Sequence, residues 1–119
     1  MKQDGGIMLR FKLPELSEHQ IQTQIINFLQ YRGYMVFRMN AGSIRTQGGK
    51  LVKLAPAGTP DIMAFKPAYE GGVDLYFIEV KRPKGKLTFF QEHKIKELEQ
   101  YGAQCFVAYS IEEVQERFK

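Results

Sequence analysis

Two short segments contain the residue types that could carry out chemistry. One runs from Gly58 to Asp61, before an apolar stretch, and the other is Glu79-Val80-Lys81, at the end of the next apolar stretch. In a β-strand, side chains two residues apart point to the same side, so the Glu79 carboxylate and the Lys81 ammonium would project together. The segment Glu92-His93-Lys94 has the same spacing but falls in an expected helix, where its two charges would diverge. The pattern therefore predicts an acid and a lysine side by side where a strand ends.

A divalent metal ion would allow the carboxylates of Asp61 and Glu79 to lie close together in their ionised forms. If their two strands are neighbours, the like charges repel, and one carboxyl keeps its proton unless a cation joins them. Mg²⁺ favours carboxylate and carbonyl oxygens and keeps several waters, which leaves positions for a phosphate oxygen and a nucleophilic water. Lys81 would orient that water or stabilise the charge that grows on the phosphate. The set indicates phosphodiester hydrolysis, and we expect Mn²⁺ to substitute for Mg²⁺.

Hydrophobic spacing and turn residues predict the elements that position these side chains. A mixed β-sheet with helices on both faces is expected, because a strand, helix and strand crossover spans residues 75–109. The expected order is helix, strand, hairpin, strand, strand, helix, strand and helix, over residues 17–33, 34–39, 44–54, 61–65, 75–80, 88–102, 105–109 and 110–118.

The two longer helices are each expected to start with a capping box and to bring one polar residue to the inward face. The first box begins at Ser17, which places Glu18 on the first turn of the apolar stripe. The second joins Thr88 to Gln91, and Gln91 shares its face with an apolar stripe that ends at Tyr101. Both polar residues have simpler explanations. An acid in the first turn complements the helix dipole, and Gln91 could serve its cap alone.

Length and composition restrict the class of protein. The 119 residues suffice for one domain, taken as residues 15–119 after a loose lead-in over residues 1–14. One cysteine cannot form an internal disulfide, and one cysteine with two histidines cannot supply a structural zinc site. We recognise neither a membrane-spanning apolar run nor a signal peptide, so we expect a cytoplasmic protein.

Basic residues gather in two segments. The net charge is +4, and residues 32–60 contain no Asp or Glu. Lys and Arg bind phosphates in a salt-dependent way, which complements an acidic metal site in a nuclease. The alternative is that these residues only solvate an exposed hairpin. The side chains that we expect to contact DNA are Arg38, Arg45, Lys50, Lys53, Arg82, Lys84 and Lys86.

These segments resemble the VRR-NUC domain (virus-type replication and repair nucleases) of the PD-(D/E)XK nuclease superfamily. The likeness rests on GTPDIMAF at 58–65 and FIEVKRPKGKLTFFQ at 77–91, and it covers nearly the whole chain from about residue 15. It implies a restriction-endonuclease-like αβββαβ core and a nuclease that leaves a 5′-phosphate. For stand-alone phage-type members it implies a homodimer that acts on branched DNA such as four-way junctions, in a bacterial or phage-infected cell.

The chain departs from the family pattern in the hairpin over 44–54, which is an addition. The resemblance also implies roles for single residues. By resemblance, the metal ligands are Asp61, Glu79, the Val80 carbonyl and Glu18, Lys81 is the catalytic lysine, and Gln91 completes the catalytic site.

Two other functions stay open. The chain could be a non-catalytic nucleic-acid-binding module of the same fold, in which Asp61, Glu79 and Lys81 form a structural ion-pair cluster. An RNA-directed nuclease would share the site and differ only in its substrate. Metal-dependent cleavage of DNA and RNA side by side separates these functions. Phe89 and Phe90 are expected to pack rather than to stack on bases.

Overall fold

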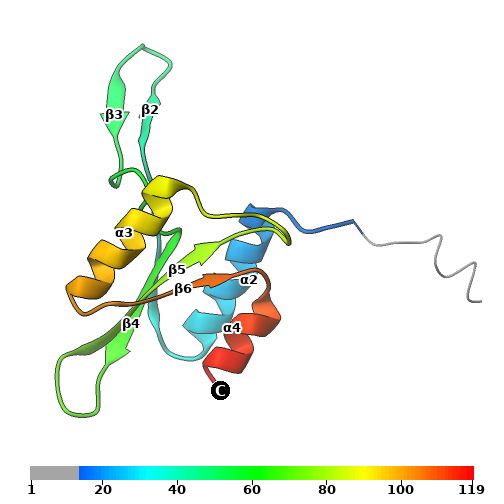
Figure 1. Cartoon of the computed structure of the whole chain (residues 1–119), viewed down its shortest axis with the longest axis vertical. Helices are drawn as coiled ribbons and strands as arrows, with labels where there is room; N and C mark the ends of the chain where they lie inside the picture. The colour runs from blue at the N-terminus through cyan, green and yellow to red at the C-terminus, as the bar shows by residue number, and fades with distance from the viewer. Residues whose placement is uncertain (1–13) are drawn as a thin grey trace, which may run out of the picture.

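The computed structural model describes residues 14–119 (Figure 1), so the lead-in predicted over residues 1–14 lies almost wholly outside the described residues. Most elements fall within a few residues of their predicted places. They are α2 (Glu18–Tyr31), β1 (Met35–Arg38), β2 (Ser43–Arg45), β3 (Leu51–Lys53), β4 (Ile62–Pro67), β5 (Val73–Val80), α3 (Phe89–Gln100), β6 (Gln104–Ala108) and α4 (Ile111–Arg117). Within the described range, the helices are too short or too polar to cross a membrane.

Four strands form one sheet in the order β1-β4-β5-β6. Strand β4 is antiparallel to both of its neighbours, whereas β6 is parallel to β5. The parallel pair is joined through α3, which is the predicted crossover. The predicted αβββαβ core is therefore confirmed as α2, β1, β4, β5, α3 and β6, with the hairpin of β2 and β3 inserted after β1.

The main core lies between the sheet and the helices α2 and α4. Ile21, Ile25 and Leu29 form one buried stripe on α2, as the sequence spacing predicts. The sheet residues of this core alternate along their strands with side chains of the opposite face, and they are Ile62, Ala64, Ile78, Val80 and Ala108. Because a one-residue slip would turn all of these side chains away from the core, this layer fixes the register of β4 against β5.

Helix α3 lies on the other face of the sheet and covers it only in part (Figure 1). It packs against β6, and none of its residues is fully buried. The prediction that Tyr101 faces inward is wrong, because 87% of its surface is exposed. Phe89 and Phe90, which were also expected to pack, are 74% and 66% exposed. The start of α3 is anchored instead by Gln91, whose side chain is hydrogen-bonded to β5.

Strands β2 and β3 form a separate two-stranded sheet that projects from the body of the molecule (Figure 1). Each strand has three residues, so the paired part is shorter than the predicted hairpin over 44–54. At the turn, Gly49 has a φ of 84°, a conformation that favours glycine. The Arg45 guanidinium donates to the Gly49 carbonyl at 2.6 Å and closes this turn.

Candidate active site

The two predicted carboxylates lie on adjacent strands at the same end of the sheet. Ile62 pairs with Ile78 in the antiparallel ladder of β4 and β5, so Asp61 and Glu79 are the next residues across from each other. The Asp61 carboxylate accepts the backbone N–H of Val80 through Oδ2 at 2.8 Å. This bond joins the start of β4 to the end of β5 and holds Asp61 beside Glu79.

The segment before Asp61 passes close to the first turn of α3. Gly58 has a φ of 87°, and a Cβ at this position would come within 2.4 Å of the carbonyl oxygen of Phe90. Pro60, two residues later, is fully buried. Glycine at position 58 therefore lets the Asp61 segment and the helix that carries Gln91 meet without a clash.

Glu79 is almost entirely buried, with 2% of its surface exposed. Its Oε2 accepts a hydrogen bond from Nε2 of Gln91 at 3.1 Å and lies 3.9 Å from Nζ of Lys81. Its Oε1 is buried and has no hydrogen-bond partner among the residues that the structure describes. Since a buried carboxylate oxygen without a partner is unfavourable, Oε1 is the atom of this site that is most open to a cation.

Burial raises the pKa values of both carboxyl groups, and the charge of Asp61 adds to the change at Glu79. Loss of solvent, followed by the charge of Asp61, raises the pKa of Glu79 to about 8, although the Lys81 ammonium opposes this change. Burial also raises the pKa of Asp61, against the lowering effect of the hydrogen bond from Val80. Paired carboxyls that resist ionisation are common in functional sites. A bound cation would favour the ionised form of both.

Gln91 makes two contacts with one side chain. Its Oε1 accepts the backbone N–H of Thr88 at 2.9 Å, which completes the predicted capping box of α3. Its Nε2 donates to Glu79 on β5. The simpler explanation, in which Gln91 only caps its helix, is therefore incomplete, because the same amide also orients the Glu79 carboxylate.

Glu18 approaches Asp61 and Glu79 from α2, which covers the face of the sheet opposite to α3. Its Oε2 accepts the backbone N–H of Arg82 at 3.4 Å, which is long for such a bond. Its charge contributes to the raised pKa values of both Asp61 and Glu79. Glu18 is thus electrostatically part of the site, although its hydrogen bond goes to the chain that follows Lys81.

The oxygen atoms of this site fit a hard divalent cation such as Mg²⁺. Mg²⁺ is usually held by one or two carboxylates together with other oxygens and waters, and Asp61 and Glu79 supply two carboxylates. Within residues 14–119, no three side chains of His, Cys, Asp or Glu form a ready-made metal cluster. Glu18 as a further carboxylate ligand and Val80 as a carbonyl ligand stay predictions.

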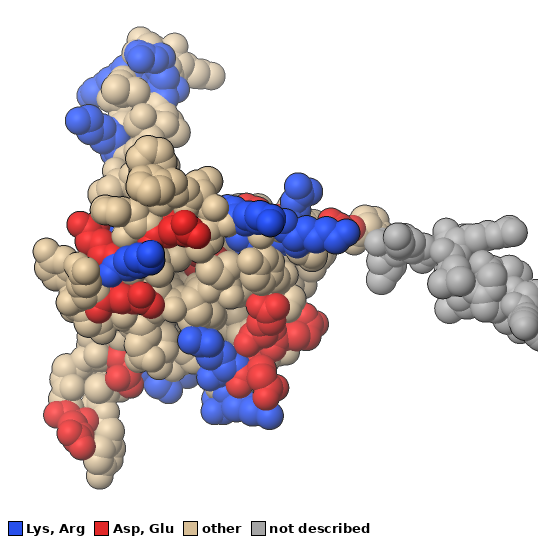
Figure 2. Space-filling model, in the orientation of Figure 1, with Lys and Arg blue, Asp and Glu red and all other residues tan. Residues whose placement is uncertain are grey.

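Most of the basic residues predicted to contact DNA are exposed in two groups. Figure 2 shows blue side chains on the projecting hairpin, which carries no acidic residue. The hairpin group is Arg45, Lys50 and Lys53, and the group on the turn after β5 is Arg82, Lys84 and Lys86. Their positions are compatible with a phosphate track, and their contact with DNA stays a prediction.

Arg38, at the end of β1, is held in place by polar side chains of α2 that the sequence reasoning missed. Its Nη1 lies 3.0 Å from Nδ1 of His19, and its Nη2 donates to Oγ1 of Thr23 at 3.0 Å. Nη1 also donates to Oε1 of Gln22. These three residues have the spacing of one helix face, which is the signal that could have grouped them. The sequence did not indicate that this face would meet Arg38.

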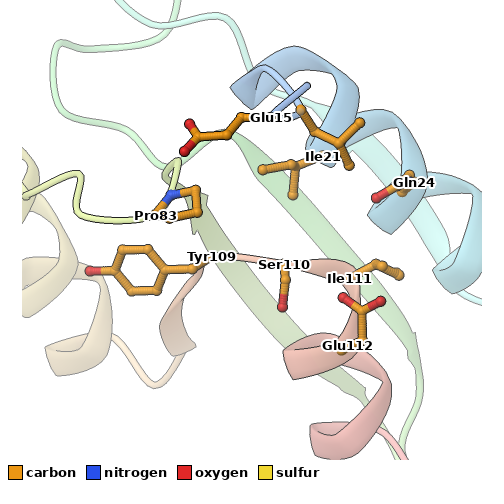
Figure 3. A pocket seen from close by; sticks show the side chains of 9 residues that line it. Glu15, Ile21, Gln24, Pro83, Tyr109, Ser110, Ile111 and Glu112 are labelled. Carbon is orange, nitrogen blue, oxygen red and sulfur yellow. The ribbon is translucent and has the colours of Figure 1, made fainter. Parts of the chain in front are cut away.

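Two cavities lie near the end of the sheet that carries Asp61 and Glu79. One, of about 500 Å³, adjoins the carboxylate pair, since Asp61 and Arg38 both line it. Another, of about 220 Å³, is lined by Ile21 of α2, by Pro83 after β5 and by Ile111 of α4 (Figure 3). The smaller cavity contains none of the predicted site residues. The larger one therefore provides the space for a ligand next to Asp61.

No family model and no curated protein matches this chain. A solved structure described as a VRR_NUC domain is similar to it, with a TM-score of 0.58 and 21% sequence identity. The similarity covers 83% of this chain and 90% of that one. The described part of the chain therefore has the fold of a VRR_NUC domain, as the sequence resemblance predicts.

Proposed function

We propose that this chain is a metal-dependent endonuclease that hydrolyses phosphodiester bonds in DNA, and that it belongs with the VRR-NUC nucleases. The observation that carries the proposal is the buried Oε1 of Glu79, which lacks a hydrogen-bond partner in the described chain. The same carboxylate lies across from Asp61, and its other oxygen, Oε2, is 3.9 Å from Nζ of Lys81. A carboxylate in this state is suited to a metal ion. The likeness of the fold to a VRR_NUC domain supports the same function.

Mg²⁺ would be held by Asp61 and Glu79, with the Val80 carbonyl and Glu18 as the remaining protein ligands, and Mn²⁺ would substitute for it. When bound, such an ion stabilises charge on a phosphoryl oxygen and lowers the pKa of water, which supplies the nucleophile for hydrolysis. The chain's own contribution is to hold two carboxylates together in a buried place. The hydrogen bond from Val80 fixes Asp61, and the hydrogen bond from Gln91 fixes Oε2 of Glu79.

Lys81 would supply positive charge to the reacting phosphate. Its Nζ lies 3.9 Å from Oε2 of Glu79, which is too far for a hydrogen bond. The ammonium group therefore keeps its donors for a substrate while its charge offsets part of the repulsion between Asp61 and Glu79. A fixed donor of this kind stabilises the negative charge that develops in the transition state.

Branched DNA, such as a four-way junction, is the substrate that we propose, cut by a homodimer. Cutting both strands of a symmetric junction needs two sites related by a twofold axis. Exposed apolar side chains on the edge strand support an interface there, because Met35 and Phe37 of β1 are 56% and 45% exposed. Light scattering that gives a monomer at assay concentrations would contradict the homodimer.

A cleavage assay tests the function directly. Wild-type protein should cut DNA with Mg²⁺ or Mn²⁺, and four-way and flap substrates should be cut faster than duplex or single strands. Ca²⁺ should support binding without cleavage, because it takes more ligands at longer distances. Glu79→Gln and Asp61→Asn should each abolish cleavage while folding and DNA binding remain, since each removes a ligand charge with little change in shape.

Different results select the other functions. Cleavage at the wild-type rate by folded Glu79→Gln protein, or full activity in excess EDTA, would falsify the proposed mechanism. Binding of DNA without cleavage under every metal condition would identify a non-catalytic module. Cleavage of matched RNA but not DNA would identify an RNA-directed nuclease.

A further inference from the structure

The cavity of about 500 Å³ lies beside Asp61, where the projecting hairpin joins the body of the molecule. One wall comes from the foot of the hairpin and includes Ile44 and Leu54. The other comes from the end of β1 and from α2, and includes Arg38 and His19. A cavity of this size can hold a small molecule or one unit of a polymer. Because Asp61 lines it, whatever binds there lies next to the proposed metal site.

The hairpin wall is apolar and exposed to solvent. Ile44 is 53% exposed, and half-buried Leu54 continues the same wall. An apolar surface of this kind favours a flat, weakly hydrated partner, because contact removes apolar area from water on both sides. A nucleobase has such a surface on each of its two faces.

The opposite wall presents a fixed positive charge. The Arg38 guanidinium is held by His19, Gln22 and Thr23 of α2, so that its side chain is already ordered. An ordered guanidinium binds phosphate with little further loss of side-chain freedom. The cavity therefore combines an apolar wall with a positive charge, which are the features that recognise a nucleotide.

We propose that this cavity binds one unpaired nucleotide next to the phosphodiester that is cut, with its base against Ile44 and its phosphate near Arg38. The inference rests on the proposed nuclease function and specifies its substrate. A paired base is stacked between its neighbours and must be extruded before it can enter a cavity, whereas an unpaired base avoids most of that cost. DNA with an unpaired nucleotide beside the cut, as at a branch point, is therefore bound in preference to continuous duplex.

The hairpin provides a matched pair of variants for a test. Ile44 and Leu51 are apolar, and they are exposed by 53% and 50%. Ile44 pairs with Val52 and Leu51 pairs with Arg45, so the two side chains point to opposite faces of the hairpin. Only Ile44 of the two lines the cavity. Ile44→Ser should therefore impair nucleotide binding, and Leu51→Ser should not.

The experiment uses DNA that carries 2-aminopurine, an adenine analogue whose fluorescence rises when it leaves the base stack. The analogue is placed either unpaired at a branch point or paired at the same position of a continuous duplex. Both DNAs are titrated with Glu79→Gln protein that comprises all 119 residues, in which cleavage is expected to be blocked. We expect a rise in fluorescence only for the unpaired analogue, and about tenfold tighter binding of that DNA.

The same titration is repeated with Ile44→Ser and with Leu51→Ser in the Glu79→Gln background. Ile44→Ser should lose the fluorescence rise and at least about fivefold of the preference for unpaired DNA, whereas Leu51→Ser should keep both within about twofold. Equal effects of the two variants, or no fluorescence rise with the parent protein, would overturn the proposal. These readouts do not depend on catalysis. The proposal of nucleotide binding can thus be rejected while wild-type protein still cuts DNA, and it can be supported even if no cleavage is found.

Discussion

Gln91 donates from Nε2 to Oε2 of Glu79 across 3.1 Å, while its Oε1 accepts the backbone N–H of Thr88 at 2.9 Å. One amide thus joins the start of α3 to the buried acid of β5. Glu at the same place in a capping box would serve the helix equally well, because either side chain accepts the N-cap N–H. Only the amide can also donate to a carboxylate. Gln91 therefore has a role at the site that a glutamate at this position would lack.

Gln91→Glu is expected to separate these two roles. The new carboxylate keeps the cap, so the free energy of unfolding at pH 5 should change by less than about 1 kcal/mol. It loses the donor to Glu79 and adds a negative charge, so cleavage at pH 7 should fall by about tenfold or more. Urea unfolding and single-turnover cleavage measure the two effects.

The chain contains a matched control for this substitution. Ser17 and Gln20 form the same capping box on α2, with bonds of 2.8 and 3.1 Å, and Gln20 is exposed. Gln20→Glu should leave both stability and cleavage near wild type. If Gln91→Glu also cleaves at the wild-type rate, Gln91 has no role beyond its cap.

The fold and the central site could be predicted because their signals are local. The alternation around Glu79 and the capping box at Thr88 follow from a few neighbouring residues, and the resemblance added the meeting of Asp61 with Glu79. Exposure could not be predicted in the same way. Tyr101 has the spacing of an inward residue, but α3 covers only part of its sheet face, and nothing in its own sequence indicates how far the helix overlies β6.

The cavity beside Asp61 was also beyond prediction, for a related reason. It depends on how the hairpin foot at Ile44 lies against Arg38 and on the packing of Arg38 against α2. These contacts join three segments that are far apart in the sequence, and each segment has ordinary local chemistry. The sequence indicates that this region is positively charged, but it does not indicate how these three segments are arranged around a cavity.

Metal-free protein is expected to lose stability as the pH rises from 6 to 8. The pKa of Glu79 is raised from 4.5 to about 8 in the folded chain, so folding favours the protonated form. Its contribution is complete below the unfolded pKa, near 4.5, and is lost as the pH rises through about 8. The slope from this one group is at most about 1.4 kcal/mol per pH unit. Urea unfolding in EDTA at several pH values measures it.

Two comparisons assign this slope to the carboxylate pair. Glu79→Gln cannot ionise, so its stability should change much less over the same pH range. Mg²⁺ should stabilise wild-type protein more at pH 8 than at pH 6, because a ligand that binds only the folded state adds stability and binds best to ionised carboxylates. A slope that is the same in wild type and Glu79→Gln would show that Glu79 is already ionised at pH 6.

Lys81→Ala is expected to reduce the rate of cleavage by about 10² to 10³-fold, which is the usual effect of removing one donor that stabilises transition-state charge. Lys81→Arg keeps the charge but changes its shape and reach, so it should recover only part of the rate. Single-turnover rates at saturating Mg²⁺ measure both variants. Unchanged cleavage by Lys81→Ala would confine Lys81 to a structural role beside Glu79.

Neutralising the hairpin is expected to weaken DNA binding in a salt-dependent manner. Replacing Arg45, Lys50 and Lys53 with Gln removes three exposed positive charges from a segment without acids. If all three contact phosphates, the slope of log K against log salt should become shallower by up to about three units. The control replaces Arg32, Arg117 and Lys119 with Gln. This change removes the same total charge from the C-terminal ends of α2 and α4. Equal slopes for the two triple variants would show that the hairpin does not follow the DNA backbone, whatever its part in binding an unpaired nucleotide.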